Sequence, residues 1–417
     1  MKIIIKAATI IDAASPFNNK KIDLLIEEGI ISNIAENIEN DSNIKELTLE
    51  NLHISSGWFD SSVSFGEPGF EDRETISNGL MVAAKSGFTA VALQPNSTPS
   101  IDNQSQVSFV KNKSNAAATD LYPIGALTKA SEGKDLAELF DMKNAGAIAF
   151  GDYNRSISNS LLFKIALQYA QDFDGLIIAF CEDKNLKGVG IANEGIISTQ
   201  LGMKGIPNLA EEVDVAKNLF ILEYTGGKLH IPTISTAKSV ELIREAKAKG
   251  LKVTCSVAVH HLTLTDETLQ AFDTRYKVTP PLREDSDRKA LIEAVIDGTI
   301  DMITSDHNPI DIEHKKMEFD LAMNGTIGLE SAYAALQTVL PTEVIVKKLT
   351  AGKAIFGIES TKIEKGAKAN FTFFTPIGTA TFTNHDILSK SKNSAFLGFE
   401  TQGQVYGILN NSQLILK

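Results

Sequence analysis

Cysteine is scarce in this chain of 417 residues, which contains only Cys181 and Cys255 and no Cys-x-x-Cys pair. A framework of disulfide bonds is therefore excluded, and the composition fits a reducing cytosol. Long apolar runs are also missing, and the run at the start, MKIIIKAATIID, is broken by Asp12 too soon for a signal peptide or a membrane span. We expect a cytoplasmic protein that does not bind a membrane.

Positive charge is in short supply as well. The 40 lysine and arginine residues are outnumbered by 52 aspartate and glutamate residues, which gives a formal net charge of −12. An acidic surface repels the phosphates of nucleic acids, so nucleic acid is not an expected partner. Hydrophobic residues make up 43% and charged residues 22% of the chain, a mixture that can form a large globular core.

Between residues 56 and 358, short apolar segments alternate with amphipathic segments of helical period. The apolar segments include TAVALQP, LYPIGAL, AIAFGD, GLIIAFCED, KLHIPTIS, KVTCSVAV and DMITSDH. Roughly eight strand–helix units predict an α/β fold, a (β/α)8 TIM-type barrel, with an open doubly wound sheet as the alternative. The chemistry of such a barrel lies where its strands end, so the residues that close each strand are the candidate site.

The two ends of the chain have a different pattern. Residues 1–55 and 359–417 contain β-rich pieces separated by Gly and Asn turns, such as KIIIKAATII and VYGILNNSQLIL. We predict that both ends pair into one small β-sandwich-like module beside the barrel of residues 56–358.

Several ordered segments resemble the type I dihydroorotases of the amidohydrolase superfamily. They are GWFDSSVSFGEPGF, AGAIAFGDYN, NEGIISTQLGMKGIP, KVTPPLR, SDHNP and SKSKN, and they are spread over nearly the whole chain. The resemblance implies hydrolysis of a cyclic amide in pyrimidine biosynthesis, with zinc as the family's metal. The lysines of SKSKN by themselves are more typical of a solvated loop than of a binding patch.

The resemblance also implies six metal-ligand positions, of which four have lost their histidine. Those four positions hold Ser62, Ser64, Phe180 and Thr233. Asp152 and Asp306 are kept, although Tyr153 replaces an acidic neighbour, and Asp306 stands at the family's general-base position. Because hydroxyls and a phenyl ring bind zinc far more weakly than imidazole does, we expect no bound zinc and an idle Asp306.

The substrate-binding positions that the resemblance implies are damaged too. Gly66 stands in place of an arginine, Thr279 in place of an asparagine and Ile310 in place of a histidine. Asn96 is kept. Recognition of the family's substrate is therefore expected to be impaired together with catalysis.

The remaining histidines offer little to replace these ligands. His307 follows Asp306 and could form an acid–base pair with it, but a strand-end histidine bonded to the backbone is the commoner outcome. His260 and His261 are expected on a strand, where neighbouring side chains point to opposite faces and cannot readily bind one ion. We interpret all three as structural.

These replacements predict a catalytically impaired member of the family, a pseudoenzyme with a degenerate metal site. By the resemblance, its role would be that of a structural partner of aspartate carbamoyltransferase, and a homo-oligomer such as a dimer is expected. The first alternative is an active dihydroorotase or other cyclic amidohydrolase whose hydroxyl and carboxylate oxygens hold a hard cation such as Mg²⁺. The second is a metabolite-binding sensor that uses the emptied pocket.

Overall fold

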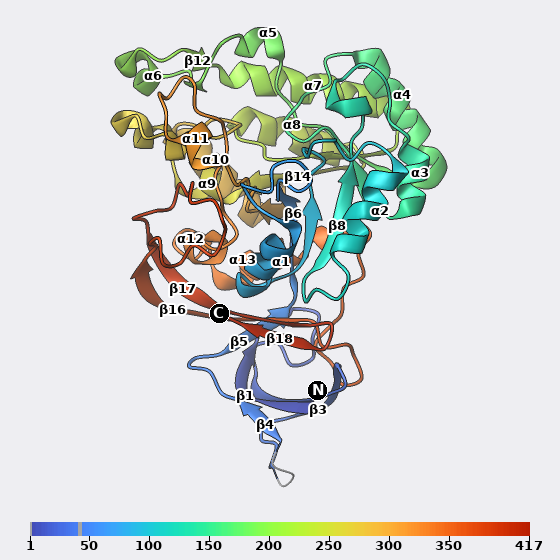
Figure 1. Ribbon diagram of the computed structural model, residues 1–417, viewed down its shortest axis with the longest axis vertical. Coiled ribbons are helices and arrows are strands. Elements are labelled where there is room, and N and C mark those ends of the chain that lie inside the picture. Colours follow the sequence, from blue (N-terminus) through green and yellow to red (C-terminus); the bar gives the residue numbers. More distant parts are fainter. Residues whose placement is uncertain (1, 41–43) are drawn as a thin grey trace.

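A computed structural model of the chain describes residues 2–40 and 44–417 (Figure 1). Eight parallel strands form the central sheet in the order β15-β14-β13-β10-β9-β8-β7-β6. An isolated bridge between Val63 and His307 links the two ends of this order, so the sheet nearly closes. The strands are β6 (Trp58–Val63), β7 (Phe88–Leu93), β8 (Asp120–Gly125), β9 (Ala149–Phe150), β10 (Leu176–Ile178), β13 (Lys228–Ile231), β14 (Val253–Ala258) and β15 (Met302–Thr304). The predicted (β/α)8 barrel is confirmed.

Helices cover the outside of this sheet (Figure 1). The side chains of Thr75, Asn103 and Thr236 accept hydrogen bonds from the first turns that follow them, which defines three helix starts. Gly146 and Gly298 end two other helices in the left-handed conformation. The main helices are α1 (Ile76–Lys85), α2 (Gln104–Lys113), α3 (Leu139–Ala145), α4 (Ser160–Ala170), α7 (Asn208–Thr225), α8 (Ala237–Ala248), α10 (Asp285–Asp297) and α13 (Thr342–Thr350).

The loops that follow the strands carry short elements of their own. A one-turn 3-10 helix, η1 (Lys129–Ser131), lies between β8 and α3. Other short elements are α5 (Lys184–Lys187), β11 (Ala192–Asn193), α6 (Ile196–Leu201), β12 (Gly205–Ile206), α9 (Val259–Thr263), α11 (Ile312–Lys315), α12 (Ala332–Leu336) and α14 (Gly352–Ile355), together with the 3-10 helices η2 (Gln171–Phe173), η3 (Asp266–Ala271) and η4 (Thr274–Tyr276). Within the described residues, every helix is too short or too polar to cross a membrane.

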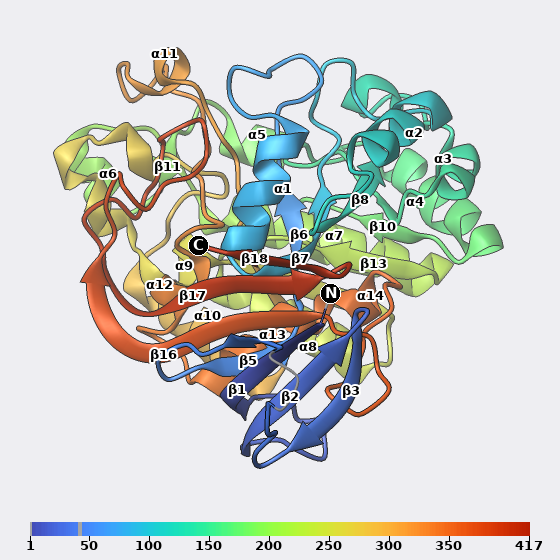
Figure 2. The ribbon, with the colours of Figure 1, turned by 60° about the horizontal axis from the view of Figure 1, so that its bottom comes forward.

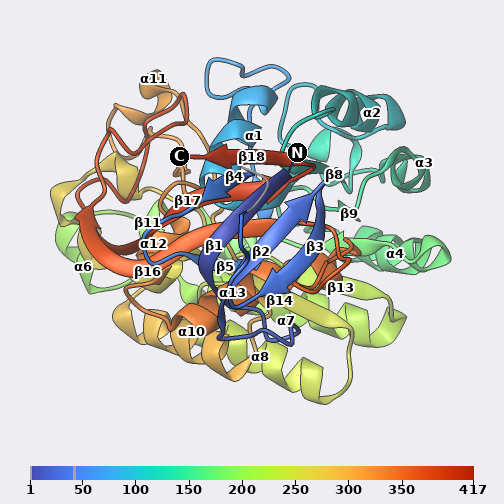
Figure 3. The same cartoon turned by 90° about the horizontal axis from the view of Figure 1, so that it is seen from below.

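Strands from both ends of the chain share a second sheet (Figures 2 and 3). Its members are β1 (Lys2–Ile10), β2 (Lys21–Glu27), β3 (Ile30–Ala35), β4 (Lys45–Leu47), β5 (His53–Ser56), β16 (Phe371–Thr381), β17 (Glu400–Asn410) and β18 (Gln413–Leu416). β16 pairs antiparallel with β5, so the two ends meet in the middle of this sheet. The domain boundaries at 55/56 and 358/359 stay a prediction. Met1 and residues 41–43 of the predicted module lie outside the described residues.

Aromatic packing joins the second sheet to the barrel. Trp58 at the start of β6 stacks on Tyr333 of α12 with ring centroids 5.1 Å apart, and it packs on Phe374 of β16 at 5.5 Å. All three rings are buried. Because aromatic side chains contribute large buried areas, this cluster holds β6 at a fixed position against the second sheet. The strand ends that carry the candidate site are therefore built on a rigid frame.

Candidate functional site at the strand ends

The aspartate that follows β15 is held by the first strand of the barrel. The hydroxyl of Ser62 donates to Oδ1 of Asp306 at 2.8 Å, and Asp306 is only 8% exposed. Burial raises the pKa of Asp306 to about 7; the charge of Asp60 adds to the rise, and hydrogen bonds from Ser62 and Tyr153 oppose it. Near neutral pH this carboxyl group is therefore protonated in a large fraction of the molecules.

Tyr153, on the loop after β9, lies against Asp306. Burial, reinforced by the charge of Asp306, raises the pKa of its phenol well above the ordinary value, so the phenol stays neutral. Tyr153, Thr233 and Asp306 have φ angles of 54°, 47° and 48°, in the left-handed region where non-glycine residues are uncommon. Three such residues in one cluster indicate a backbone that the surrounding structure holds under strain.

Side chains leave little space at the centre of the site. The inner cavity has a volume of about 10 Å³, about the space of one water molecule. It is lined by Ser62, Gln94, Tyr153, Asn154, Ile178, Phe180, Pro232, Thr233, Thr279 and Asp306. The structure thus brings five of the predicted positions around one small cavity, and the ring of Phe180, itself 5% exposed, forms part of the wall.

Asp152, the other kept carboxylate, is bound to a neighbouring loop. Its Oδ1 accepts from the backbone N–H of Thr128 at 3.0 Å, and its Oδ2 accepts from the Thr128 hydroxyl at 2.5 Å. Burial raises the pKa of Asp152, while the hydrogen bonds from Thr128 oppose that rise. Asp152 therefore anchors the loop after β8. No motif or spacing indicated Thr128 as this partner, because it lies 24 residues before Asp152.

Of the predicted substrate positions, Thr279 lines the inner cavity, and Asn96 and Ile310 line a larger neighbouring cavity. Asn96 donates through its amide to the hydroxyl of Ser64 at 2.8 Å, so these two residues bind each other. Gly66 has a φ of 74°, and a Cβ added there would come within 2.5 Å of the carbonyl oxygen of Phe70. An arginine at position 66 therefore requires a different local backbone from the present one.

Thr279 and Ile310 also make defined contacts. The side-chain amide of Asn324 donates to the hydroxyl of Thr279 at 3.2 Å. Ile310 is buried, and its backbone N–H donates to Oδ1 of Asn393 at 3.0 Å. Both residues thus fasten loops, and neither contributes a charge to the site.

His307 and His230 are bonded to groups other than Asp152 and Asp306. The backbone N–H of Gly328 donates to Nδ1 of His307 at 3.2 Å, which agrees with the structural interpretation of this histidine. Nδ1 of His230 lies 2.9 Å from the hydroxyl of Thr254, and its Nε2 lies 3.2 Å from the hydroxyl of Ser256. Burial lowers the pKa of His230 to about 3 and that of His307 to about 4, so both rings are neutral.

The expectation that His260 and His261 lie on a strand is wrong. They belong to the short helix α9 directly after β14, and their ring centroids are 4.4 Å apart. Both are buried, and both ring nitrogens of His260 lack a hydrogen-bond partner. Across residues 2–40 and 44–417, no three His, Cys, Asp or Glu side chains form a group that could hold a metal ion.

A larger cavity, the outer cavity, adjoins the inner one. Its volume is about 750 Å³, and Tyr153 and Asn154 line both cavities. Its wall carries Arg73 and Arg155. The remaining polar side chains on its wall are Asn96, Ser97, Thr98, Ser100, Asp102, Ser131, Asp152, Asn308 and Asn324. A pocket of this size accommodates a small metabolite.

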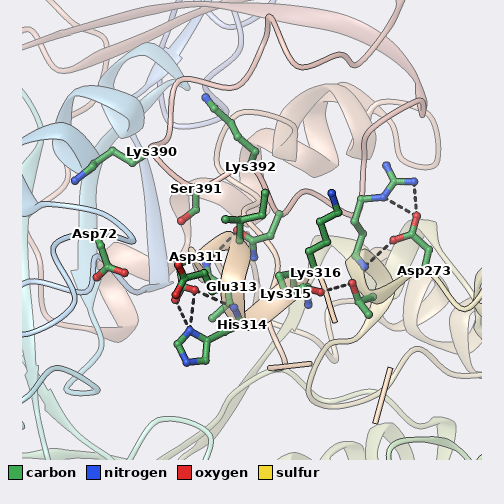
Figure 4. Close-up of a pocket in the computed structure, with 15 residues that line it drawn as sticks. Asp72, Asp273, Asp311, Glu313, His314, Lys315, Lys316, Lys390, Ser391 and Lys392 are labelled. Carbon is green, nitrogen blue, oxygen red and sulfur yellow. Dashed lines mark hydrogen bonds and ion pairs between the residues drawn. The ribbon is translucent and has the colours of Figure 1, made fainter. Parts of the chain in front are cut away.

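A third cavity, of about 700 Å³, shares Ile310 with the outer cavity (Figure 4). Some of its charged groups form ion pairs. Arg275 bonds Asp273 at 2.6 Å, and Asp311 contacts both His314, at 2.7 Å, and Arg73, at 2.9 Å. The other charged residues on its wall form no ion pair among the described residues; they are Asp72, Glu313, Lys315, Lys316, Lys390 and Lys392.

The SKSKN segment forms one side of the third cavity. Lys390 and Lys392 are exposed, as expected for a solvated loop, but Ser389, Ser391 and Asn393 are buried. The interpretation of the whole segment as a solvated loop is therefore wrong for these three residues. Their backbone and side chains take part in hydrogen bonds that hold the segment against the barrel loops.

Comparison with known proteins gives the family of this chain. Residues 53–239 match the family model described as dihydro-orotase-like. The chain is 41% identical over 424 residues to the dihydroorotase of Pelotomaculum thermopropionicum, and the alignment covers 100% of this chain and 99% of the relative. The chain belongs to the dihydroorotase family. Another dihydroorotase, from Syntrophus aciditrophicus, is 39% identical with 100% and 99% coverage.

Solved structures support the same fold. An L-hydantoinase from Arthrobacter aurescens superposes with a TM-score of 0.84 at 18% identity, covering 100% of this chain and 97% of that one. A D-hydantoinase from Thermus sp. gives a TM-score of 0.81 at 20% identity, also with 100% and 97% coverage. At this identity the likeness concerns the barrel and its accompanying β-sheet alone.

Two segments that carry the dihydroorotase resemblance meet at Arg283. Its guanidinium group donates to Oδ1 of Asn193 and to the carbonyl oxygen of Ile206, both at 3.0 Å. It also donates to the hydroxyl of Ser235 and lies 3.9 Å from Glu211. Arg283 is 4% exposed. The family-typical stretches NEGIISTQLGMKGIP and KVTPPLR thus meet in a buried structural network.

Proposed function

We propose that this member of the dihydroorotase family has lost metal-dependent hydrolysis and keeps its fold for a structural role in pyrimidine biosynthesis. The observation that carries the proposal is the lining of the inner cavity. Ser62, Thr233 and Phe180 stand where the resemblance places imidazoles. Zinc sites are built from imidazole, thiolate and carboxylate, so the residues present do not fit zinc.

The two kept carboxylates are committed to the fold as well. Both oxygens of Asp152 accept hydrogen bonds from Thr128, and Asp306 is buried with a pKa of about 7. Hydrolysis of a cyclic amide at neutral pH needs a strong nucleophile, and a general base alone contributes about 10²–10⁴-fold. Asp306 acting on ordinary water therefore falls far short of a metal-assisted reaction.

A second candidate is an active cyclic amidohydrolase. It is favoured by the 41% identity to a protein named dihydroorotase over the whole chain. The hydroxyls of Ser62 and Thr233 and the carboxyl of Asp306 are oxygen donors of the kind that hard cations such as Mg²⁺ accept. Against it, Phe180 places an apolar ring at the same cavity, which has room for only about one water molecule.

Metal analysis and a turnover assay separate the two candidates. The purified full chain is analysed for bound metals, and hydrolysis of dihydroorotate is measured with and without added Zn²⁺, Mg²⁺ and Mn²⁺. We expect substoichiometric metal and turnover no faster than that of a heat-denatured sample. Metal-dependent turnover that disappears in Asp306→Asn would overturn the proposal, whereas turnover that survives this substitution comes from a contaminating enzyme.

We further propose that the chain is a homodimer and that its partner is the aspartate carbamoyltransferase of the same organism. The support is the family resemblance, together with a net charge of −12 that disfavours nucleic acid as a partner. Co-expression followed by size-exclusion chromatography with light scattering tests both statements. A monomer that elutes separately from the transferase, at concentrations well above those in the cell, contradicts them.

A further inference from the structure

The SKSKN segment belongs to a loop that leaves the second sheet after β16 and returns to it at β17. The ends of this loop meet, because the N–H of Phe382 donates to the carbonyl oxygen of Phe399 and the N–H of Gly398 donates to that of Phe382, both at 2.9 Å. From there the loop rises towards α11 and forms one side of the third cavity (Figures 1 and 2). Loops whose ends are closed in this way are frequently functional.

Polar groups attach residues 388–394 of this loop, here called the clasp, to the barrel. Leu388 is the single apolar side chain of the clasp, and it is only partly buried. Ile387 and Ala395, on either side of the clasp, are buried. Segments that bury little apolar surface lie at the low end of local stability in a protein. The clasp is therefore expected to open more readily than the barrel core.

Two buried carboxylates hold the first half of the clasp. Oε1 of Glu330, in the loop after β15, accepts from the backbone N–H of Ser389 at 3.0 Å and from its hydroxyl at 2.6 Å. Oε2 of Glu74, in the loop after β6, accepts from the backbone N–H of Lys390 at 3.0 Å. Because β6 and β15 are the first and last strands of the barrel, the clasp crosses from the last barrel loop to the first.

These two carboxylates form an incomplete polar network. Burial raises the pKa of Glu74, and the charge of Glu330 adds to the rise, so the two groups repel each other. Oε2 of Glu330 has no hydrogen-bond partner within the described residues. The ring of His307 lies 4.0 Å from this oxygen, but it is neutral and supplies no counter-charge. A partly satisfied network holds its members less firmly than a complete one, which makes this attachment easier to release.

Asn393 fastens the other half of the clasp to the loop after β15. Its Oδ1 accepts from the backbone N–H of Ile310 at 3.0 Å. Its side-chain amide donates to the carbonyl oxygens of Asn308, at 3.1 Å, and Gly325, at 3.2 Å. Ile310 lines both the outer and the third cavity, and Asn393 lines the third. The clasp thus holds in place the wall that the two cavities share (Figure 4).

We propose that the clasp is a movable closure whose release frees the loop after β15 and opens the wall between the outer and the third cavity, while the barrel stays folded. In the closed state Glu330, Glu74 and Asn393 bond the clasp, and in the open state water takes the place of these bonds. Release joins two spaces of about 750 Å³ and 700 Å³. The clasp goes beyond the proposed loss of hydrolysis and does not depend on it, since neither a metal nor turnover is involved.

Hydrogen–deuterium exchange of the full chain, followed by mass spectrometry, tests whether the clasp opens as one unit. Ser389→Ala removes the hydroxyl that bonds Glu330 in the first half of the clasp. The backbone amides of Ile310 and Ile327 bond Asn393 in the other half. If both halves open together, exchange at these two amides becomes about 10-fold faster or more, because a hydrogen bond to a charged group is lost. Unchanged exchange there overturns the proposal.

The reaction rate of a thiol placed in the shared wall tests whether that wall opens. Ile310 is 2% exposed, so Ile310→Cys carries its thiol in a buried position, and the two native cysteines, which are buried as well, give the background rate. We expect Ser389→Ala to accelerate alkylation of Ile310→Cys by about the same factor as it accelerates exchange. Faster exchange without faster alkylation would show that the clasp loosens while the wall stays closed, which overturns the proposal.

Asn159→Ala is the matched control for global destabilisation. Asn159 caps α4 by accepting from the N–H groups of Leu161 and Leu162, so its loss lowers stability without touching the clasp. We expect it to leave exchange at Ile310 and Ile327 unchanged, and equal acceleration by the control would show that the clasp opens only with global unfolding, which overturns the proposal. Dihydroorotate turnover is measured on the same samples. Turnover overturns the proposed loss of hydrolysis alone, and unaccelerated exchange overturns the clasp alone.

Discussion

The hydroxyl of Ser62 donates a 2.8 Å hydrogen bond to Oδ1 of Asp306 and so joins the first and last strands of the barrel at their carboxyl ends. A neutral hydroxyl donor stabilises a buried, ionised carboxylate less than a cation does. Burial therefore dominates and raises the pKa of Asp306 to about 7. The residue at the general-base position of the family is, in this chain, a buried acid whose ionisation lowers the stability of the folded protein.

Replacing this acid with its neutral isostere should stabilise the protein. Between pH 4 and 7 the folded chain holds a proton on Asp306 that the unfolded chain, with a pKa near 3.8, has released. Stability is therefore lost as the pH rises through this range. Asp306→Asn removes the loss, and we expect it to raise the free energy of unfolding at pH 8 by on the order of 2–4 kcal/mol and by less at pH 5. Urea unfolding at both pH values measures this.

Asp135→Asn serves as the matched control, because Asp135 is an exposed residue of the η1 loop. It should change stability by about 0.5 kcal/mol or less at either pH. If Asp306→Asn instead destabilises the chain at pH 8, the carboxylate is ionised and favourably bonded, and the argument from burial fails.

Returning histidines to the four replaced positions should create a metal site. The combined variant Ser62→His, Ser64→His, Phe180→His and Thr233→His supplies imidazoles beside the kept Asp306, the donors that zinc prefers. We expect about one zinc ion per chain in the variant, measured by elemental analysis after dialysis, and much less in the unchanged protein. Turnover is not expected to follow at once, because Gly66 and Ile310 still lack the side chains of the family. Zinc uptake equal to that of the unchanged chain would show that the backbone no longer brings these positions together.

The sequence predicted the barrel, and five of the residues singled out from it line one cavity, but it did not predict how the side chains there are used. Alternation of apolar and helical segments is a local property, and so is the order of the family motifs. The bond between Thr128 and Asp152 depends on two loops that meet only after the barrel closes. The strained turn of Ala130 and Ser131 is likewise invisible in composition, because neither residue type favours positive φ.

The placement of His260 and His261 shows the same limit from another side. The apolar run KVTCSVAV predicted a strand, and β14 is indeed one, but the strand ends at Ala258 and the helix α9 begins at the next residue. Boundaries depend on tertiary packing that a propensity argument does not contain. The prediction of element type was therefore right, but its extension to His260 and His261 was wrong.

The Arg283 network should be more important for stability than for chemistry. Arg283→Met removes the cation beside the buried carboxylate of Glu211, which keeps its hydrogen bonds from Ser235 and Thr236, and removes the donor to Oδ1 of Asn193. We expect a loss of about 3–5 kcal/mol in the free energy of unfolding, the range for breaking one side of a buried charge pair. Arg244→Met, at an exposed pair, should cost about 1 kcal/mol or less. Equal effects of the two substitutions in urea unfolding would contradict a structural role for the network.

The buried histidines predict a loss of stability in mild acid. Burial, with a smaller contribution from His261, lowers the pKa of His260 well below 6.5 in the folded chain. Below about pH 6.5 the unfolded chain therefore takes up a proton that the folded chain does not, and stability falls as the pH falls. His260→Leu removes the group that takes up this proton. It also removes two buried ring nitrogens that have no hydrogen-bond partner, so we expect equal or greater stability at pH 7. The slope of unfolding free energy between pH 6.5 and 5 should become shallower by up to about 1.4 kcal/mol per pH unit. His385→Leu, at an exposed position, is the control, and an unchanged slope in His260→Leu would mean that His260 is protonated in the folded protein.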